Sequence, residues 1–469
     1  MEFQAVVLAG GRGSRFTDLT NSKGKCLLPV GNLPLIWYSL HNLVKLGFKE
    51  AIVVVNDSVK SEVASLPEKY GLPIQLEVVS ISSSNQDRGD ESEDDEEECG
   101  STGDALRLIH SRITAPRVLL MSSDLITTLR PIQEVTNLHR IHRSAFTALF
   151  FKDKPMNTKK LPGPKSKHKK ERDIVGLDKS HHNQICFLSS EADLEEMLTL
   201  KRSLLKEHSR ISFHTNLNDA HLYIMEKWVL DFLVNNKGIS TLKGELFPYL
   251  VKKQFSSKTQ ISEKKKEDTL LQDDDNLDKP TGISNFLQMD DMIQQAQSLS
   301  NWSGNFGDLS NAYCDRALRV YAHVSNEPLH RVNNLPVYCD VNRNIQELVE
   351  VFDIPKDNRK DKGSTKPTIV GDNVFIGSGS VIDNKTTLTN TSIGSNCRIS
   401  PKVKLSNCIL MDGVTVKEGS NVEGSIICDN AEIGPNCEIQ DCIIGSGITI
   451  ETGKRKNEVI QEVDKMMEI

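Results

Sequence analysis

The sequence lacks the signals that would send it out of the cell or into a membrane. Its amino-terminal stretch, MEFQAVVLAGG, has neither the basic start nor the cleavage site of a secretory signal peptide. No apolar stretch approaches the roughly 20 residues that span a bilayer. The ten cysteines are scattered and include no CxxC pair, so a disulfide framework is not expected. We therefore expect a cytosolic protein without a membrane segment.

The chain also lacks a strong excess of one charge. Lys and Arg number 57 against 64 Asp and Glu, which gives a net charge of −7. This balance offers no general attraction to nucleic acid or to an anionic membrane, and we expect no direct nucleic-acid partner. At 469 residues the chain exceeds what one hydrophobic core usually serves, which predicts two or more domains.

The first part of the chain alternates between apolar runs and stretches with helical spacing. Short runs such as QAVVLA, AIVVVN and AFTALFF predict buried strands, and residues 34–46 have the spacing of a helix. A further run, RVLLMSSD, ends in the carboxylate of Asp124. Strands that alternate with helices predict a Rossmann-like α/β domain with a mostly parallel sheet, whose ligand site lies at the carboxyl ends of the strands.

From residue 367 onward the sequence becomes periodic. Aliphatic residues recur at spacings of six, six and five, so that Ile376, Ile393, Leu410, Ile427 and Ile444 each follow the previous one by 17 residues. Glycines directly follow several aliphatics, at positions 377, 394, 434 and 445. This pattern is typical of a left-handed parallel β-helix of hexapeptide repeats, a triangular prism in which each aliphatic packs on its counterpart one coil away. We expect these glycines to help turn the corners, and exposed apolar side chains on one face to mark a subunit contact.

Two kinds of chemistry are not expected in the prism. Many such prisms are acyltransferases with a histidine as general base, but no histidine follows His330. The cysteines of this region follow the phase of the coils, which favours packing over metal binding. They are Cys397, Cys408, Cys428, Cys437 and Cys442.

These patterns divide the chain into a sheet domain over 1–300, a connecting segment over 301–366, the β-helix over 367–453 and a tail over 454–469. Charged insertions interrupt the sheet domain near 85–99, 152–172 and 256–280. The first holds nine acidic residues and the second nine Lys and Arg. Such compositions are too polar to pack against a core and predict solvated insertions. For the basic insertion, a contact with RNA or with an acidic partner is the functional alternative.

A glycine-rich turn follows the first predicted strand, in AGGRGSRFTDLTNSKGK. Gly10, Gly11 and Gly13 have no side chains, so backbone N–H groups could approach a phosphate closely, and Arg15 and Lys25 could neutralise it. A tight turn from strand to helix can equally need glycine for the fold alone. The longer pattern, GxG[ST]R with a lysine ten residues after the arginine, resembles the signature of nucleotidyltransferases that make nucleoside-diphosphate sugars.

This resemblance implies roles for individual residues. It implies that Asp124 binds magnesium, with Asp219 or its neighbour Asn218 as a second ligand, because one carboxylate cannot complete an octahedral site. A cap at the strand end is the structural alternative for Asp124. No cofactor is required, but GTP, ATP or a nucleotide sugar with magnesium could occupy the loop. The implied nucleotide-binding residues are Leu8, Gly10, Gly11, Gly13, Arg15, Lys25 and, in the stretch GSTGDALRLI that resembles a base-binding loop, Gly103.

Two departures from the transferase signature argue against transfer. The active families read Pro-Lys-Pro around the lysine, where this chain has Gly24-Lys25-Cys26. They also carry a Glu-Lys-Pro segment whose lysine grips the sugar phosphate, and the corresponding stretch here, FLSSEADLEEM, contains no lysine. Phosphoryl transfer depends on holding both phosphates in line. We therefore assign no catalytic residue.

A transferase-like domain followed by a hexapeptide prism also resembles the gamma-subunit family of the guanine-nucleotide exchange factor for eukaryotic translation initiation factor two. Stretches such as LPVGNLPLIWY, FPYLVKKQFSS and GSGITIETGKRKNEVI carry this resemblance nearly from end to end. It implies a non-catalytic, regulatory subunit that forms a heterodimer with epsilon and joins alpha, beta and delta in a decamer. That decamer promotes GDP-to-GTP exchange on initiation factor two. Because the chain ends about twenty residues after the last coil, no exchange domain of its own is expected.

Two other functions remain open at this point. One is a sugar-1-phosphate nucleotidyltransferase similar to GDP-mannose pyrophosphorylase, which the glycine loop favours. The other is a regulatory subunit that binds a nucleotide without turning it over. The missing lysine of the Glu-Lys-Pro segment favours the subunit over the enzyme.

Overall fold

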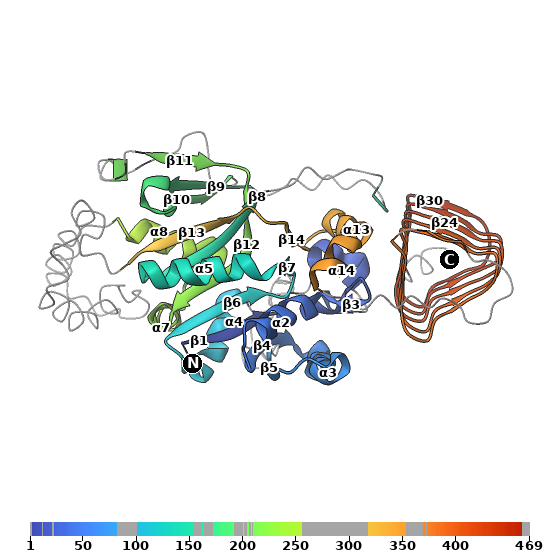
Figure 1. Ribbon diagram of the computed structural model, residues 1–469, viewed down its shortest axis with the longest axis horizontal. Coiled ribbons are helices and arrows are strands. Elements are labelled where there is room, and N and C mark those ends of the chain that lie inside the picture. The colour runs from blue at the N-terminus through green and yellow to red at the C-terminus, as the bar shows by residue number, and fades with distance from the viewer. Residues whose placement is uncertain are drawn as a thin grey trace, which may run out of the picture.

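The structure is a computed structural model in which a sheet domain and a triangular coil lie side by side (Figure 1). It describes residues 2–11, 13–20, 23–81, 101–152, 161–163, 172–191, 200, 204–205, 208, 210–255, 318–352, 369–371 and 373–461. The insertions expected near 85–99 and 256–280 lie outside these residues. Of the basic insertion, only residues 152, 161–163 and 172 are described.

One large sheet forms the centre of the first domain. β1, β4, β5, β6, β8, β9 and β13 point in one direction, and β10, β11 and β12 in the other. The predicted α/β fold with its mostly parallel sheet is thereby confirmed. In spatial order the strands are β11 (Ile211–His214), β9 (Asp173–Asp178), β10 (Gln184–Ser190), β13 (Val320–Ser325), β8 (Phe146–Lys152), β12 (Leu217–Glu226), β6 (Arg117–Ser122), β1 (Phe3–Leu8), β4 (Glu50–Asn56) and β5 (Gln75–Ile81).

Helices cover both faces of this sheet and create two apolar cores. The alternation along β1 decides which core each side chain joins, because Ala5 and Val7 point into one and Val6 into the other. The first core is completed by α2 (Leu35–Lys45), α3 (Lys60–Tyr70), α5 (Leu129–His142), α13 (Leu335–Arg343) and α14 (Ile345–Phe352). The second is completed by α4 (Thr102–Ile109), α7 (Lys227–Asn235) and α8 (Phe247–Lys253). No helix among the described residues is both long enough and apolar enough to cross a membrane.

Both domains extend past the boundaries expected from the sequence. β13 falls in the segment expected to be a connection, yet it lies in the sheet between β10 and β8. A six-residue strand that follows a long polar stretch carries no local sign of the domain it joins. At the other end, β30 (Lys454–Lys456) and β31 (Val459–Ile460) continue the prism into the segment expected to be a tail.

The carboxyl-terminal domain is a prism of three parallel sheets, as predicted for a left-handed β-helix. The repeating aliphatics fill its interior; Ile393, Leu410, Ile427 and Ile444, for example, are buried and stacked coil on coil. The sheets are β15 (Ile369–Val370), β18 (Thr387–Thr389), β21 (Lys404–Ser406), β24 (Asn421–Glu423), β27 (Glu438–Gln440) and β30; β16 (Phe375–Ile376), β19 (Ser392–Ile393), β22 (Ile409–Leu410), β25 (Ile426–Ile427), β28 (Ile443–Ile444) and β31; and β17 (Val381–Ile382), β20 (Arg398–Ile399), β23 (Thr415–Val416), β26 (Glu432–Ile433) and β29 (Thr449–Ile450).

The prism glycines act differently from the sequence expectation. Gly377 and Gly394 are not left-handed corner residues; a Cβ atom on either would come within 2.6 Å of the backbone of the next coil. Left-handed corner positions are instead held by other residues, such as Asn396 (φ 56°), Asn430 (φ 57°) and Gly413 (φ 73°). The glycines that follow the aliphatics therefore permit close stacking of coils, whereas asparagines and other glycines turn the corners.

The predicted cysteine packing is confirmed inside the prism. Cys397, Cys408, Cys437 and Cys442 are buried in its interior cluster. Cys428 differs, because it faces outward and joins the core that the prism shares with the sheet domain. Burial raises the pKa of the Cys397 thiol to about 11, which keeps it protonated and unreactive at neutral pH.

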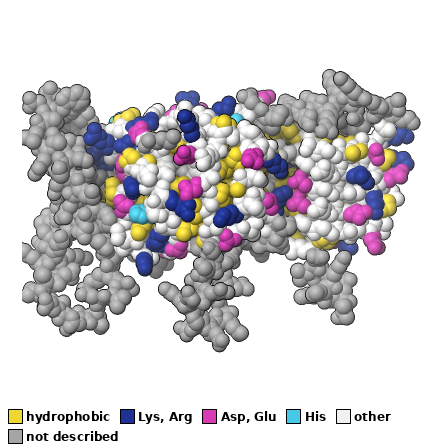
Figure 2. Space-filling model, turned by 90° about the horizontal axis from the view of Figure 1, so that it is seen from below, with side chains coloured by type: hydrophobic (Ala, Val, Ile, Leu, Met, Phe, Trp, Pro, Cys, Tyr) yellow, Lys and Arg dark blue, Asp and Glu magenta, His cyan; other side chains and the backbone are white. Residues whose placement is uncertain are grey.

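One face of the prism is apolar, but the chain itself covers it. Phe375, Ile409, Ile426, Ile443 and Val459, here called the docked face, point out of the β16–β31 sheet into the core formed with α13 and α14. The outward residues of the other two sheets are mostly polar or charged. Figure 2 shows charged side chains of both signs interspersed on the prism, at the right of the view. Among the described residues, the apolar face of the prism, expected to be exposed as the mark of a partner, is therefore covered by the sheet domain.

Polar contacts reinforce this junction. The Lys23 ammonium lies 3.4 Å from Asp412 and 3.3 Å from Asp429. The Asn32 amide donates to the Ile393 carbonyl oxygen at 2.8 Å. From the basic insertion, the Gly163 N–H donates to the Asp441 carbonyl oxygen at 2.8 Å. Three separate segments of the sheet domain thus hold the prism in one orientation.

Candidate functional site

The glycine loop lies at the carboxyl end of β1, between the ends of β4 and β6. Gly11 is exposed, and a Cβ atom there would meet nothing within 4 Å. Gly10 is more enclosed, because its Cβ atom would lie 3.0 Å from Ile81. Gly13 has a φ of 80°, which L-residues rarely adopt. The fold alone thus accounts for Gly10 and Gly13, while Gly11 leaves open backbone where a phosphate could approach.

Lys25 turns back from the end of this loop onto Asp124. It lies in η2 (Lys25–Leu27), and its Nζ atom is 2.6 Å from Asp124 Oδ2. Arg15, by contrast, is on the exposed side of the loop. Lys25, one of the two cations expected to meet a phosphate, is thus committed to an internal carboxylate.

Asp124 is the most strongly paired acid of the site. Its side chain is 2 % exposed, the Ser122 hydroxyl donates to Oδ1 at 2.6 Å, and Arg331 Nε lies 3.6 Å from Oδ2. Burial works to raise the pKa of Asp124, but the charges of Lys25 and Arg331 outweigh it and hold that pKa well below its usual value. The carboxylate is therefore ionised and already balanced by two protein cations.

Asp219, the expected second magnesium ligand, is also engaged. The Tyr223 hydroxyl donates to its Oδ2 atom at 2.5 Å, and the His221 backbone N–H donates to Oδ1 at 2.8 Å. Burial raises the pKa of Asp219 above its usual value, although the bond from Tyr223 acts in the other direction. A magnesium ion between Asp124 and Asp219 would have to displace the Lys25 ammonium and compete with these donors. The donor set present here therefore fits the ion poorly.

Gly103 lies away from open space. It is the second residue of α4, its N–H donates to the Ser240 carbonyl oxygen at 2.7 Å, and a Cβ atom would lie 2.5 Å from that oxygen. Ser101 caps the helix in a capping box with Asp104. The glycine is thus required by packing against the segment around Ser240, and its expected contact with a nucleotide base stays a prediction.

Sequence reasoning missed two residues of this site. Arg331 comes from β14 (Leu329–Arg331), which pairs with β7 (Leu125–Thr127) directly after Asp124. His221 lies at an irregularity in the pairing of β12 with β8, with a φ of 51°. Its Nε2 atom is buried without a hydrogen-bond partner among the described residues, and burial together with the charge of Arg331 lowers the pKa of His221 well below its usual value. No spacing in the sequence connects either residue to Asp124.

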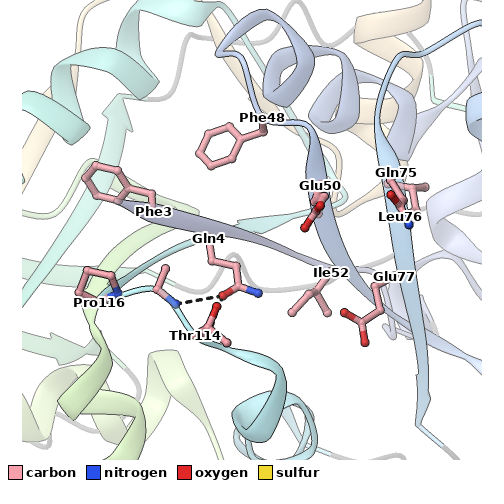
Figure 3. Close-up of a pocket in the computed structure, with 12 residues that line it drawn as sticks. Phe3, Gln4, Phe48, Glu50, Ile52, Gln75, Leu76, Glu77, Thr114 and Pro116 are labelled. Carbon is pink, nitrogen blue, oxygen red and sulfur yellow. Dashed lines mark hydrogen bonds between the residues drawn. The ribbon is translucent and has the colours of Figure 1, made fainter. Parts of the chain in front are cut away.

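A separate cavity of about 590 Å³ lies at the opposite end of the strands. Phe3, Glu50 and Gln75 begin β1, β4 and β5 and line it, as Figure 3 shows. The Gln4 side chain closes one wall by accepting a hydrogen bond of 2.9 Å from the Thr114 N–H. A ligand in this cavity would be separated from the glycine loop by the length of the strands.

Comparison with known proteins identifies both domains. A family model described as nucleotidyl transferase matches residues 4–160, and one described as EIF2B subunit epsilon LbH domain matches residues 359–455. Translation initiation factor eIF2B subunit gamma of Schizosaccharomyces pombe is 27% identical over 81% of this chain and 72% of that protein. The Dictyostelium discoideum protein of the same name is 25% identical over 85% of this chain and 88% of that protein. The Caenorhabditis elegans protein of the same name is 31% identical over 55% of this chain and 60% of that protein. Over most of its length, and in both domains, the chain is thus similar to eIF2B gamma subunits.

The extent of these similarities bears on how the site is interpreted. The two family models leave residues 161–358 unmatched, and Arg331 and Asp219 both fall in that interval. The match to nucleotidyl transferases therefore includes the glycine loop and Asp124 but not the groups that complete the surroundings of Asp124 here. Resemblance to transferases over residues 4–160 supports the fold of the loop rather than the activity of the site.

Proposed function

We propose that this chain is a member of the eIF2B gamma-subunit family and a non-catalytic, regulatory subunit of the exchange factor. The observation that carries the proposal is the similarity to eIF2B gamma of Dictyostelium discoideum over 85% of the chain, across both domains. In this role the chain pairs directly with epsilon, joins alpha, beta and delta in a decamer in the cytosol, and promotes GDP-to-GTP exchange on initiation factor two. Its rigid polar prism faces and open sheet edges suit an assembly role.

The arrangement around Asp124 supports the absence of transfer chemistry. A transferase would use Asp124 to hold magnesium against the triphosphate, whereas here Lys25 and Arg331 neutralise that carboxylate. Lys25 has less positive charge to offer a phosphate while it stays in this ion pair. The alternative, a sugar-1-phosphate nucleotidyltransferase, is favoured by the open backbone at Gly11 and by the family match over residues 4–160.

A pyrophosphate assay separates these two functions. The purified full-length chain is incubated with GTP or ATP, magnesium and a set of hexose 1-phosphates, beside an active sugar-nucleotide transferase as the positive control. We expect no release above buffer. Steady release that Asp124→Asn abolishes would establish the enzyme and overturn the proposal.

Assembly is tested independently of activity. The tagged full-length chain is expressed in eukaryotic cells and recovered under mild salt, and the bound proteins are identified. We expect epsilon in equal amount, with alpha, beta and delta. Recovery of the chain alone, in a folded and soluble form, would contradict the assembly role.

Titration calorimetry with GTP, ATP and GDP-mannose addresses a nucleotide-sensing subunit. A pure scaffold gives no binding heat. Binding that is lost in Arg15→Ala would instead support a regulatory site at the glycine loop, because Arg15 lies on its exposed side.

A further inference from the structure

Three side chains with metal-binding chemistry meet at the carboxyl end of β9. Asp178 ends the strand, His181 ends the short helix η5 (Lys179–His181), and His208 comes from the segment between β10 and β11. Asp178 Oδ2 is 2.7 Å from Nδ1 of His181 and 2.7 Å from Nδ1 of His208. All three ligand atoms lie within 4.8 Å of one another.

The orientation of Asp178 is fixed by the backbone. Its Oδ1 atom accepts a hydrogen bond of 2.8 Å from the Ser180 N–H, so Oδ2 is the oxygen presented to both rings. The rings of His181 and His208 meet edge to face, with centroids 5.1 Å apart and planes at 77°. His208 is further held by an edge contact with Phe255, at 5.3 Å between centroids. The two Nδ1 atoms therefore converge on one oxygen from different directions.

We propose that Asp178, His181 and His208 bind one divalent transition-metal ion of the zinc class. Two imidazole nitrogens and one carboxylate oxygen are a preferred donor set for such an ion, with a fourth position left for water. The side chain of Asp178 is 1 % exposed and that of His181 is 30 % exposed, so the site is anchored in the protein and open on one side. To admit the ion, the atoms now 2.7 Å apart would separate to roughly 3.3 Å, the spacing of neighbouring ligands in tetrahedral zinc.

The charge of the site suits a cation. Burial acts to raise the pKa of Asp178, but the bonds from His208 and His181 outweigh burial and lower it, so the carboxylate is ionised at neutral pH. Cys186 is not among the residues whose ligand atoms converge, so the donor set is two nitrogens and one oxygen without sulfur.

The site would join two parts of the chain. Asp178 and His181 lie at the end of β9 and in η5, whereas His208 follows Leu204 between β10 and β11. A metal ion would fix that segment at the end of β9. The alternative is a hydrogen-bonded cluster in which both rings donate Nδ1–H to Asp178 and no ion binds.

The test uses the full-length chain without a histidine tag, freed of metal by a chelator and dialysis. Zinc is titrated against a chromophoric chelator, and the fold is monitored by circular dichroism. We expect one zinc per chain and a weakening of at least 10-fold in His208→Gln and in Asp178→Asn. The matched control is His182→Asn, which removes the exposed neighbouring histidine and should bind as the wild type does.

X-ray absorption of the zinc-loaded wild type keeps the proposal testable if the variants do not fold. We expect two imidazole ligands, oxygen ligands and no sulfur. No saturable zinc binding by the wild type, equal binding by His208→Gln, or a sulfur ligand in the absorption spectrum would each overturn the proposal in favour of the hydrogen-bonded cluster or another site.

Discussion

At the residue scale, the end of β6 carries a carboxylate whose charge the protein balances by itself. Asp124 is almost fully buried, and Lys25 approaches it to 2.6 Å while Arg331 lies at 3.6 Å. Removing one partner from a buried ion pair is costly because the remaining charge keeps its desolvation penalty without its attraction. The pair thus ties the glycine loop to the sheet, whatever ligand the loop receives.

We expect Lys25→Met to lower the free energy of unfolding by on the order of 3 kcal/mol at pH 7. The folded pKa of Asp124 is depressed, so the stabilisation by Lys25 is complete above the unfolded pKa of about 3.9 and is lost as pH falls through the folded value. The difference between wild type and variant should therefore shrink below about pH 4. Urea unfolding at several pH values measures it.

The double variant Lys25→Met/Asp124→Asn is the control for this prediction. It removes both charges of the 2.6 Å pair and should recover part of the lost stability. Equal stability of Lys25→Met and the wild type at pH 7 would mean that Arg331 alone suffices to balance Asp124.

The buried His221 predicts how the stability of the protein changes in acid. Because burial lowers its folded pKa well below the unfolded value of about 6.5, the unfolded chain binds the extra proton first. Stability should fall as pH decreases below about 6.5, by up to about 1.4 kcal/mol per pH unit from this group. His221→Asn, which tolerates the φ of 51°, should show a shallower slope between about pH 5 and 6.5. His182→Asn, at an exposed position with a φ of 55°, controls for the placement of asparagine on left-handed backbone.

At the element scale, each prism coil depends on how closely the next one approaches. Gly394 shows this, because a Cβ atom there would lie 2.6 Å from the backbone of Met411 in the following coil. We expect Gly394→Ala to lower the free energy of unfolding by at least about 3 kcal/mol. The new Cβ atom would clash with backbone atoms, which cannot move aside as the end of a flexible side chain would. Gly447→Ala is the comparison: it meets nothing within 4 Å but has a φ of 70°, and should cost about 1–2 kcal/mol. Similar losses in denaturant titrations would contradict this distinction.

The elements that the sequence predicts well are those whose contacts are periodic. Ile393, Leu410 and Ile427 could be placed in the prism interior because each packs on a residue 17 positions away, and that spacing is visible in the sequence. β13 could not be placed, because its partner β8 precedes it by well over a hundred residues. Resemblance to nucleotidyltransferases placed Lys25 and Asp124 in one site. Nothing in the sequence indicated Arg331, because its approach to Asp124 depends on the pairing of β14 with β7.

At the scale of the whole molecule, the docked face unites the domains. Ile409, Ile426 and Ile443 precede the inward aliphatics by one position, so they point outward, and they are buried in the core that also contains α13 and α14. The sequence pattern does not reveal this contact between the domains, because it shows which residues point outward from the prism but not whether solvent or another domain covers them. Among the described residues, the docked face is therefore already covered and is not open to a proposed partner subunit.

Ile426→Lys tests whether the two domains unfold as one. Ile426 is 1 % exposed, and a lysine there would bring an unpaired charge into the shared core and remove apolar contacts worth about 2–5 kcal/mol. We expect one calorimetric transition for the wild type and two for Ile426→Lys, with faster proteolysis between the domains. Glu423→Lys, on an exposed position of the neighbouring face, should keep one transition near the wild-type temperature. A single unshifted transition in Ile426→Lys would show that Lys23, Asn32 and Gly163 hold the prism without the docked face.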